Sequence, residues 1–257
     1  MSPIRGIVFD LGNTLMYFAG DWDAVTQAGV DALVEFLRAH AVAVPPEFGI
    51  AFVEMRRAGR MQAAHREIEY TATQALHDTL AEYRLDRVDA ETLAGGVAAF
   101  FEPEAEQWVP YADAHSTLAQ LHSQGYRLGA ISNATDDALI RRLVARGGLA
   151  DLLDPIVSSA AVPWRKPDPR IFQHLLDLWH CAPVDAVMVG DWPDTDILGA
   201  HRAGMRAILL EEPGATAEID GAIAKHLPVT VPDAHLGEPD LVIHHLSELP
   251  TVLARWK

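Results

Sequence analysis

The chain has 257 residues, 49% of them hydrophobic and 22% charged, so it can bury a large core as one large domain or two modest ones. Its formal net charge of −16 argues against nucleic-acid binding, which needs a positive surface, and disfavours docking on anionic membranes. Cys181 is the only cysteine, so no intramolecular disulfide can form. There is no signal-peptide pattern and no long apolar segment, and we therefore expect a cytoplasmic protein.

The first predicted element is a buried strand over residues 4–10. Its apolar residues end at Asp10, and the turn-forming residues Gly12 and Asn13 follow at once. Open α/β sheets carry their chemistry at the carboxyl ends of the strands, where a carboxylate can act as a nucleophile. Asp10 is therefore the first candidate for a catalytic residue.

A helical insertion is predicted after this strand. From about Asp23 to Phe101, apolar residues recur at helical spacing, and no segment alternates convincingly as a strand would. We expect four helices, the last over about residues 90–101. Together they predict a small helical bundle that occupies residues 16–108.

Helices and strands then alternate along the chain. The predicted elements are helix 114–123, strand 127–132, helix 136–145, strand 155–158, helix 169–180, strand 186–190, helix 197–203, strand 206–210, strand 241–243 and helix 247–255. Strands separated by helices of about ten residues imply right-handed crossovers and a parallel, doubly wound sheet, so the fold class is α/β. We expect residues 1–15 and 109–257 to form this core. Residues 211–240 are expected to form a surface loop with one short helix at about 216–225.

Residues suited to chemistry follow the predicted strands or precede a helix. They are Asp10, Gly12 and Asn13 after the first strand, Ser132 and Asn133 after the second, Lys166 before a helix, and Asp191 and Asp196 after the fourth strand. Because parallel strands end at the same edge of a sheet, we expect these residues to converge. Carboxylates from two strands form an oxygen-rich site that suits Mg²⁺. A hydroxyl, an amide and a lysine beside them suit a phosphoryl group, to which the turn amides add donors.

These four segments resemble the four sequence motifs of the haloacid dehalogenase (HAD) superfamily, in their usual order. The resemblance covers residues 4–15 and about 110–210, and residues 16–108 resemble the cap of the subfamily whose cap follows the first motif. It implies a Rossmann-like HAD core with an inserted all-helical cap domain. Such a cap would close over the site, exclude bulk water and select the substrate.

The resemblance also implies a role for each motif residue. Asp10 would be the nucleophile that accepts the phosphoryl group as an aspartyl-phosphate. Lys166 would neutralise the phosphoryl charge and orient Asp10. Asp191 would bind Mg²⁺ with Asp10 and with the backbone carbonyl of Gly12, and Asp196 would bind or support the ion. The expected substrate-binding residues are Gly12, Asn13, Ser132, Asn133 and Lys166.

Gly12 departs from the family pattern, which usually has an aspartate at this position. That aspartate protonates the leaving oxygen and then activates water, and such acid–base catalysis contributes roughly 100- to 10,000-fold in rate. Asn13 is adjacent but cannot titrate. Asp21, Asp23 and His65 could replace the missing acid, although no spacing supports any of them.

Other chemistries of the superfamily fit less well. Haloacid dehalogenation runs without a metal, whereas the acidic residues of the fourth motif are typical of a metal site. Phosphonoacetaldehyde hydrolysis needs a cap lysine, and the only lysines are Lys166, Lys225 and Lys257, none of them within residues 16–108. Phosphohexose mutase activity depends on the aspartate that Gly12 replaces.

The sequence therefore favours a Mg²⁺-dependent phosphomonoester hydrolase that acts on a small soluble phosphorylated metabolite. The alternative is a non-catalytic or very weakly active HAD-like protein that binds a phosphorylated ligand or a protein partner, as Gly12 suggests. A substrate could meet Arg56, Arg57, Arg60, His65 and Tyr70, although a solvated helix face accounts better for most of them. Neither the particular substrate nor the oligomeric state can be predicted from these patterns.

Overall fold

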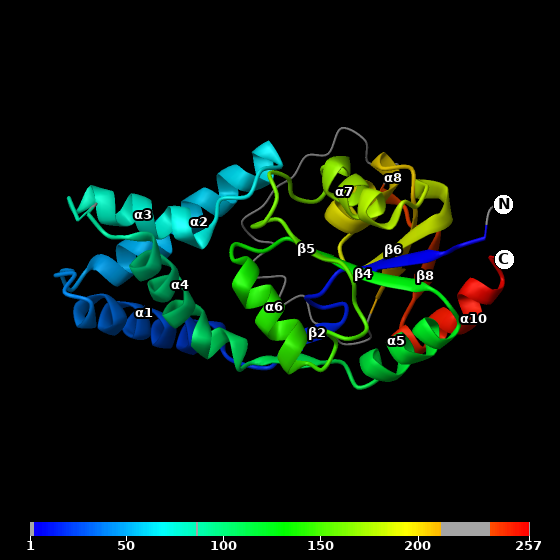
Figure 1. Ribbon diagram of the computed structural model, residues 1–257, viewed down its shortest axis with the longest axis horizontal. Coiled ribbons are helices and arrows are strands. Elements are labelled where there is room, and N and C mark those ends of the chain that lie inside the picture. Colours follow the sequence, from blue (N-terminus) through cyan, green and yellow to red (C-terminus); the bar gives the residue numbers. More distant parts are fainter. Residues whose placement is uncertain (1–2, 86, 212–236, 257) are drawn as a thin grey trace.

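The computed structural model describes residues 3–85, 87–211 and 237–256. Its main sheet has six parallel strands, which confirms the predicted doubly wound sheet (Figure 1). In spatial order these strands are β5 (Ile156–Ser158), β4 (Arg127–Ser132), β1 (Gly6–Phe9), β6 (Ala186–Gly190), β7 (Arg206–Leu210) and β8 (Leu241–Ile243). The chain adds β4 and β5 on one side of β1 and then β6, β7 and β8 on the other side. The strand order therefore reverses at β1, the place where such sheets bind their ligands.

Side chains of the strands alternate between the two faces of the sheet. On β1, Ile7 and Phe9 belong to one buried hydrophobic cluster, and Val8 belongs to a second. On β6, Val189 joins the first cluster and Met188 the second. Both faces are apolar because helices cover both, as is usual for parallel sheets.

The helices of the core divide between these faces. The cluster around Ile7 and Phe9 receives side chains from α5 (Ala114–Ser123), α6 (Asp137–Arg146) and α10 (Leu249–Ala254). The cluster around Val8 receives side chains from α7 (Pro169–Trp179) and α8 (Leu198–Arg202). In Figure 1, α7 and α8 lie above the sheet, and α5 and α10 lie below it. The predicted helix at 197–203 corresponds to α8, and one π-helical turn, Pro193–Ile197, precedes it.

Four further helices lie together at one end of the molecule (Figure 1). They are α1 (Trp22–Ala39), α2 (Phe48–Arg66), α3 (Ala72–Glu82) and α4 (Ala90–Ala105). Asp21, Thr71 and Asp89 cap the N-termini of α1, α3 and α4 by accepting a backbone N–H bond. Fully buried side chains such as Leu33 and Phe52 fill the space between the helices. The four predicted helices of this segment are confirmed.

Two short strands that the sequence did not indicate flank these helices. β2 (Met16–Phe18) pairs antiparallel with β3 (Trp108–Pro110), so the segment leaves and re-enters the core through one ladder. The residues expected to be all helical, 16–108, thus begin with a strand. Three-residue strands are too short for a period-2 pattern to be seen in the sequence.

The end of α2 also contacts the core. The backbone N–H of Arg165 donates to the carbonyl of Glu67 at 3.1 Å, and the N–H of Ala72 donates to the carbonyl of Thr135 at 2.8 Å. The hydroxyl of Ser159 donates to the Glu69 carboxylate at 2.6 Å. These bonds fix the turn between α2 and α3 on loops at the carboxyl edge of the sheet.

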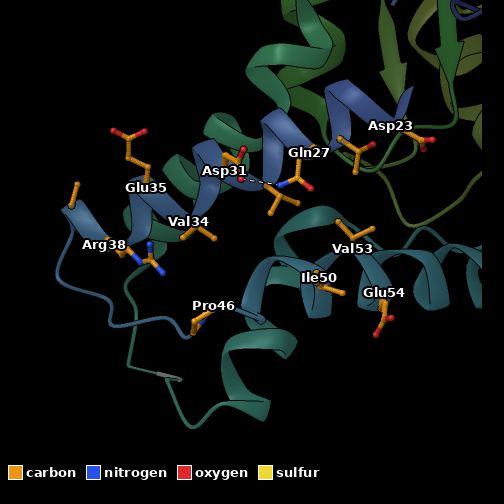
Figure 2. A pocket seen from close by; sticks show the side chains of 13 residues that line it. Asp23, Gln27, Asp31, Val34, Glu35, Arg38, Pro46, Ile50, Val53 and Glu54 are labelled. Atoms are coloured by element: carbon orange, nitrogen blue, oxygen red, sulfur yellow. Dashed lines mark hydrogen bonds between the residues drawn. The ribbon is translucent and has the colours of Figure 1, made fainter. Parts of the chain in front are cut away.

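A groove of about 1110 Å³ lies between α1 and α2 (Figure 2). Val34, Ile50 and Val53 point into it, and Asp31 and Glu54 are among the charged residues along its sides. Asp23, one of the residues considered for the missing acid, lines this groove, and none of the motif residues does.

The two remaining predictions concern a helix within residues 211–240 and the lack of a long apolar segment. The helix expected at about 216–225 lies outside the described residues. Among the residues that are described, no helix combines the length and the apolar character that crossing a bilayer requires.

Candidate active site

Three aspartates converge at the carboxyl edge of the sheet. Asp10 follows β1, Asp191 follows β6, and Asp196 lies in the π-helical turn Pro193–Ile197. One carboxylate oxygen from each lies within 4.8 Å of the others. Asp10 and Asp196 are buried, and Asp191 is half-buried. The predicted convergence of the first and fourth motifs is confirmed.

Local sequence explains how these carboxylates come together. The Asp10 N–H donates to the carbonyl of Val189 at 2.9 Å, which joins the ends of β1 and β6. A Cβ at Gly190 would overlap the Asp196 carboxylate, so only glycine allows that side chain to fold back against the strand end. The N–H of Trp192 then donates to Asp196 Oδ2 at 3.1 Å and holds it there.

Lys166 is the positive group of the cluster. Its Nζ lies 2.5 Å from Asp10 Oδ1 and 2.6 Å from Asp196 Oδ1, and it donates to the Ile131 carbonyl at 2.9 Å. The lysine is almost wholly buried. It therefore links the strand ends of β1 and β4 to the turn that carries Asp196.

The loop that carries Lys166 is held by Asn133. The N–H of Lys166 donates to Asn133 Oδ1 at 2.8 Å, and Asn133 Nδ2 donates to the carbonyl of Lys166 at 2.9 Å. Asn133 follows β4, so this pair of bonds fixes the loop before α7 against the sheet. The amide of Asn133 is thus engaged with the protein itself.

Burial and mutual repulsion set the protonation of the cluster. Burial, with a smaller contribution from the Asp196 charge, raises the pKa of Asp10 to about 6 against the opposing effect of Lys166. Burial and the charges of Asp10 and Asp196 raise the pKa of Asp191 well above its ordinary value. Burial alone would lower the pKa of Lys166, but the two carboxylates beside it outweigh burial and raise it.

The donor set suits a divalent cation. Three carboxylates face one ammonium group, so the ionised cluster holds an excess of negative charge in a largely buried place. Oxygen ligands from carboxylates are those that Mg²⁺ prefers. An ion bound to Asp10, Asp191 and Asp196 would offset the repulsion that adds to burial in raising the pKa of Asp10 and Asp191.

The other predicted residues lie around this cluster. Ser132 ends β4 and is buried, beside the Ile131 carbonyl that Lys166 contacts. Asn13 adopts a left-handed conformation with φ of 57° in the turn after Asp10. A Cβ on Gly12 would lie 3.2 Å from Cη2 of Trp108, so an indole ring covers this position.

Sequence reasoning missed two residues beside the cluster. Thr14 is fully buried, and its hydroxyl lies 3.4 Å from Asp191 Oδ1. Trp108 reaches Gly12 from β3 and donates from Nε1 to Glu104 at 3.3 Å. The sequence gives no signal for the burial of Thr14, because turn residues usually lie at the surface. The position of Trp108 depends on the β2–β3 ladder, for which the sequence gives no signal.

Comparison with known proteins identifies the family. The family model for haloacid dehalogenase-like hydrolases matches residues 4–204, and a second, HAD-hydrolase-like model matches residues 163–249. The chain therefore belongs to the haloacid dehalogenase-like hydrolase family, as its motifs predict. The fold and the order of the site residues agree with this membership.

Individual relatives carry more specific names. The glyceraldehyde 3-phosphate phosphatase of Methanothermobacter thermautotrophicus is 42% identical over 124 residues, which are 48% of this chain and 54% of that protein. The match thus spans about half of that relative's length. The protein of the same name in Pyrococcus furiosus is 27% identical over 99% of this chain and 95% of its own. A crystal structure of 2-haloacid dehalogenase from Pseudomonas syringae covers 99% of this chain and 100% of its own, with 27% identity and a TM-score of 0.63.

Proposed function

We propose that this protein is a Mg²⁺-dependent phosphomonoester hydrolase that acts on a small phosphorylated metabolite through an aspartyl-phosphate on Asp10. The observation that carries the proposal is the contact of Lys166 with Asp10 inside a cluster of three carboxylates. A protein that only binds a ligand has little use for a nucleophile held in this way.

The geometry supports different roles for the two carboxylate oxygens of Asp10. Lys166 contacts Oδ1, so Oδ2 is the oxygen left to attack phosphorus. As the new bond to Oδ2 forms, the bond from phosphorus to the leaving oxygen breaks, and water later hydrolyses the aspartyl-phosphate. Lys166 and the Ser132 hydroxyl would stabilise the negative charge of the phosphoryl oxygens during both steps.

Asp10, Asp191, Asp196 and the Gly12 carbonyl are the groups that would hold Mg²⁺. When bound, the ion supplies positive charge beside the phosphoryl oxygens. Asn133 acts as a positioning residue, because its amide fixes the Lys166 backbone.

Among the described residues, the position that usually supplies a proton to the leaving oxygen has no donor. Gly12 carries no side chain, and the carboxylate of Asp21 is used to cap α1. We infer that esters with leaving groups of low pKa are the better substrates, because they need least protonation.

We also propose residues 16–108 as a cap domain over a core of residues 1–15 and 109–257. Helices α1–α4 lie within the first range, and the β2–β3 ladder lies where the two ranges meet. Closure of such a cap would exclude water from the phosphoryl transfer.

The names of the relatives support a small phosphorylated substrate. Two archaeal relatives are named as glyceraldehyde 3-phosphate phosphatases, one of them similar over nearly the full chain. The similar dehalogenase shows that the scaffold also serves another reaction. The carboxylate cluster favours the phosphatase, because haloacid hydrolysis in this family needs no metal.

One observation favours a second candidate, a weakly active or non-catalytic protein that binds a phosphorylated ligand. It is the absence of a carboxyl group at Gly12, where an indole ring lies instead. The two candidates differ in whether a phosphoryl group is transferred to Asp10 and then hydrolysed.

The test is a screen of small phosphate esters with Mg²⁺ and with EDTA, on the wild type and on Asp10→Asn. The proposal predicts Mg²⁺-dependent release of phosphate that the variant loses by at least about a thousandfold, as expected when a nucleophile is removed. Equal turnover in the two proteins, or none above background in the wild type, would refute it.

A further inference from the structure

Three arginines gather beside the proposed catalytic site. Arg56 and Arg60 are four residues apart on α2, so they share one face of that helix. Arg165 comes from the core and directly precedes Lys166. The positive charge of Arg60, added to the effect of burial, lowers the pKa of Arg56, to about 10, and that of Arg165. These three residues are named the arginine cluster below.

Two contacts place the arginine cluster at the carboxyl edge of the sheet. Arg56 donates to the hydroxyl of Thr135 at 3.4 Å, and Thr135 lies three residues after Ser132. Arg165 lies 3.6 Å from Glu69, which in turn accepts a bond from Ser159 just after β5. The cluster therefore lies where the helical segment faces the site, on the side of β4 and β5.

The arginine cluster has unused donors. The Nε atoms of Arg56 and Arg165 are buried and have no hydrogen-bond partner among the described residues. Over the same part of the chain, no carboxylate lies within 4.0 Å of Arg60 or Arg56. The Arg56 guanidinium is already stacked on the Phe100 ring, 4.5 Å from its centroid, so the buried Nε of Arg165 is the donor best suited to a ligand.

The carboxyl groups around the arginine cluster also accept hydrogen bonds from other donors, and only Glu69 forms an ion pair with the cluster among the described residues, at 3.6 Å from Arg165. Glu69 accepts from Ser159, and Asp136 accepts from the Leu139 N–H at 2.8 Å. Glu104 accepts from Trp108, the residue whose ring covers Gly12. The charges of Glu104 and Asp136 raise the pKa of Arg56, but burial outweighs them and leaves that pKa lowered.

We propose that the arginine cluster binds a second anionic group of the substrate, so that the preferred substrates are phosphomonoesters whose leaving group carries a carboxylate or another phosphate. This inference rests on the proposed function, because it assumes that the transferred phosphoryl group is bound at Asp10. Planar guanidinium groups bind both kinds of anion through paired N–H bonds. A leaving group that extends from Asp10 towards α2 would meet them.

The test compares matched esters with and without the second anion. One arm compares 2-phosphoglycolate with 2-hydroxyethyl phosphate, and the other compares fructose 1,6-bisphosphate with fructose 6-phosphate. We expect kcat/KM to be about tenfold or more higher for the ester with the second anion in at least one arm. The arm that shows the preference identifies whether the anion is a carboxylate or a phosphate.

Variants assign this preference to the arginine cluster. Arg60→Gln and Arg165→Gln should lower the kcat/KM ratio of each favoured pair towards one. Arg57→Gln is the matched control, because Arg57 is exposed on the same helix as the exposed Arg60 and its substitution removes the same charge outside the arginine cluster. If the ratio is near one in the wild type, or if the three variants lower it equally, the inference is wrong while the phosphatase function stands.

A separate measurement covers the case in which no ester is hydrolysed, which would contradict the proposed function. Calorimetry in Mg²⁺ would then compare phosphonoacetate with ethylphosphonate as ligands. Tighter binding of phosphonoacetate that Arg60→Gln abolishes supports the arginine cluster as an anion site. Equal binding of the two phosphonates overturns it.

Discussion

Gly12 is the residue at which this site departs furthest from the family pattern. The space that a side chain would need is bordered by Trp108, whose indole carbon Cη2 would lie 3.2 Å from a Cβ atom at this position. Trp108 is itself fixed by its bond to Glu104 and by edge-on packing with Phe18 and Trp22. An aspartate side chain at position 12 would therefore need space that the Trp108 ring occupies.

This steric restriction predicts the outcome of adding the missing acid. Gly12→Asp alone should raise turnover of esters with poor leaving groups by less than about tenfold, because the indole restricts the new carboxyl group. Gly12→Asp combined with Trp108→Leu should raise it further, and Trp108→Leu alone should not. Steady-state kinetics on alkyl and aryl phosphates measures this. An equal gain in the single and double variants would show that Trp108 is no obstacle.

At the scale of elements, the site depends on loops from different strands that bind one another. Lys166 lies before α7, but its backbone is bonded to Asn133 after β4 and its Nζ to the Ile131 carbonyl. The sequence predicted Asn133 as a substrate-binding residue, whereas in the structure its amide group is hydrogen-bonded to both the N–H and the carbonyl of Lys166. The ammonium group is therefore positioned by β4 as much as by its own loop.

Asn133→Ala tests this link between elements. Removing the amide leaves the N–H and the carbonyl of Lys166 without these partners, which should cost about 1–3 kcal/mol in the free energy of unfolding. Activity should fall as well, because Lys166 would no longer be held against Asp10. Urea unfolding and kcat/KM are the measurements, with the exposed Asp194→Ala as control, expected to change stability by less than about 0.5 kcal/mol. Wild-type activity in Asn133→Ala would contradict the positioning role.

At the scale of the whole molecule, the carboxyl groups of Asp10, Asp191 and Asp196 lie close together at the carboxyl edge of the sheet. Asp191 has a raised pKa, chiefly from burial and then from Asp10 and Asp196. A carboxyl group whose pKa is raised by folding destabilises the folded state as the pH rises above the ordinary pKa of the group, and the loss is complete above the raised pKa. The site therefore costs stability unless a cation offsets it.

Asp191→Asn should thus have opposite effects with and without metal. In EDTA at neutral pH the variant should have a higher Tm than the wild type, because one of three clustered charges is gone. In Mg²⁺ the wild type should gain about 2.7 kcal/mol at a hundredfold excess over Kd, and the variant much less. The Tm values of the wild type and the variant in the two buffers test this prediction. A variant that is less stable in EDTA and equally stabilised by Mg²⁺ would contradict the metal assignment.

The sequence predicted those parts of the molecule that depend on local pattern. The strands of the core are short apolar runs followed by Asp10, Ser132 and Asp191, and their shared edge follows from parallel topology. Contacts between distant segments gave no such signal. Trp108 reaches the site through a ladder of three-residue strands. Arg56, expected on a solvated face, instead packs on the Phe100 ring, with its Cζ 4.5 Å from the ring centroid.

The central claim is that Asp10 carries the phosphoryl group during the reaction. The most direct measurement is acid quenching of the enzyme during turnover of a hydrolysed ester in Mg²⁺, followed by mass spectrometry of the peptide that contains Asp10. We predict one added phosphoryl group on Asp10 in the wild type and none in Asp10→Asn. A peptide that stays unmodified while phosphate is released, or the same modification in the variant, would contradict the account.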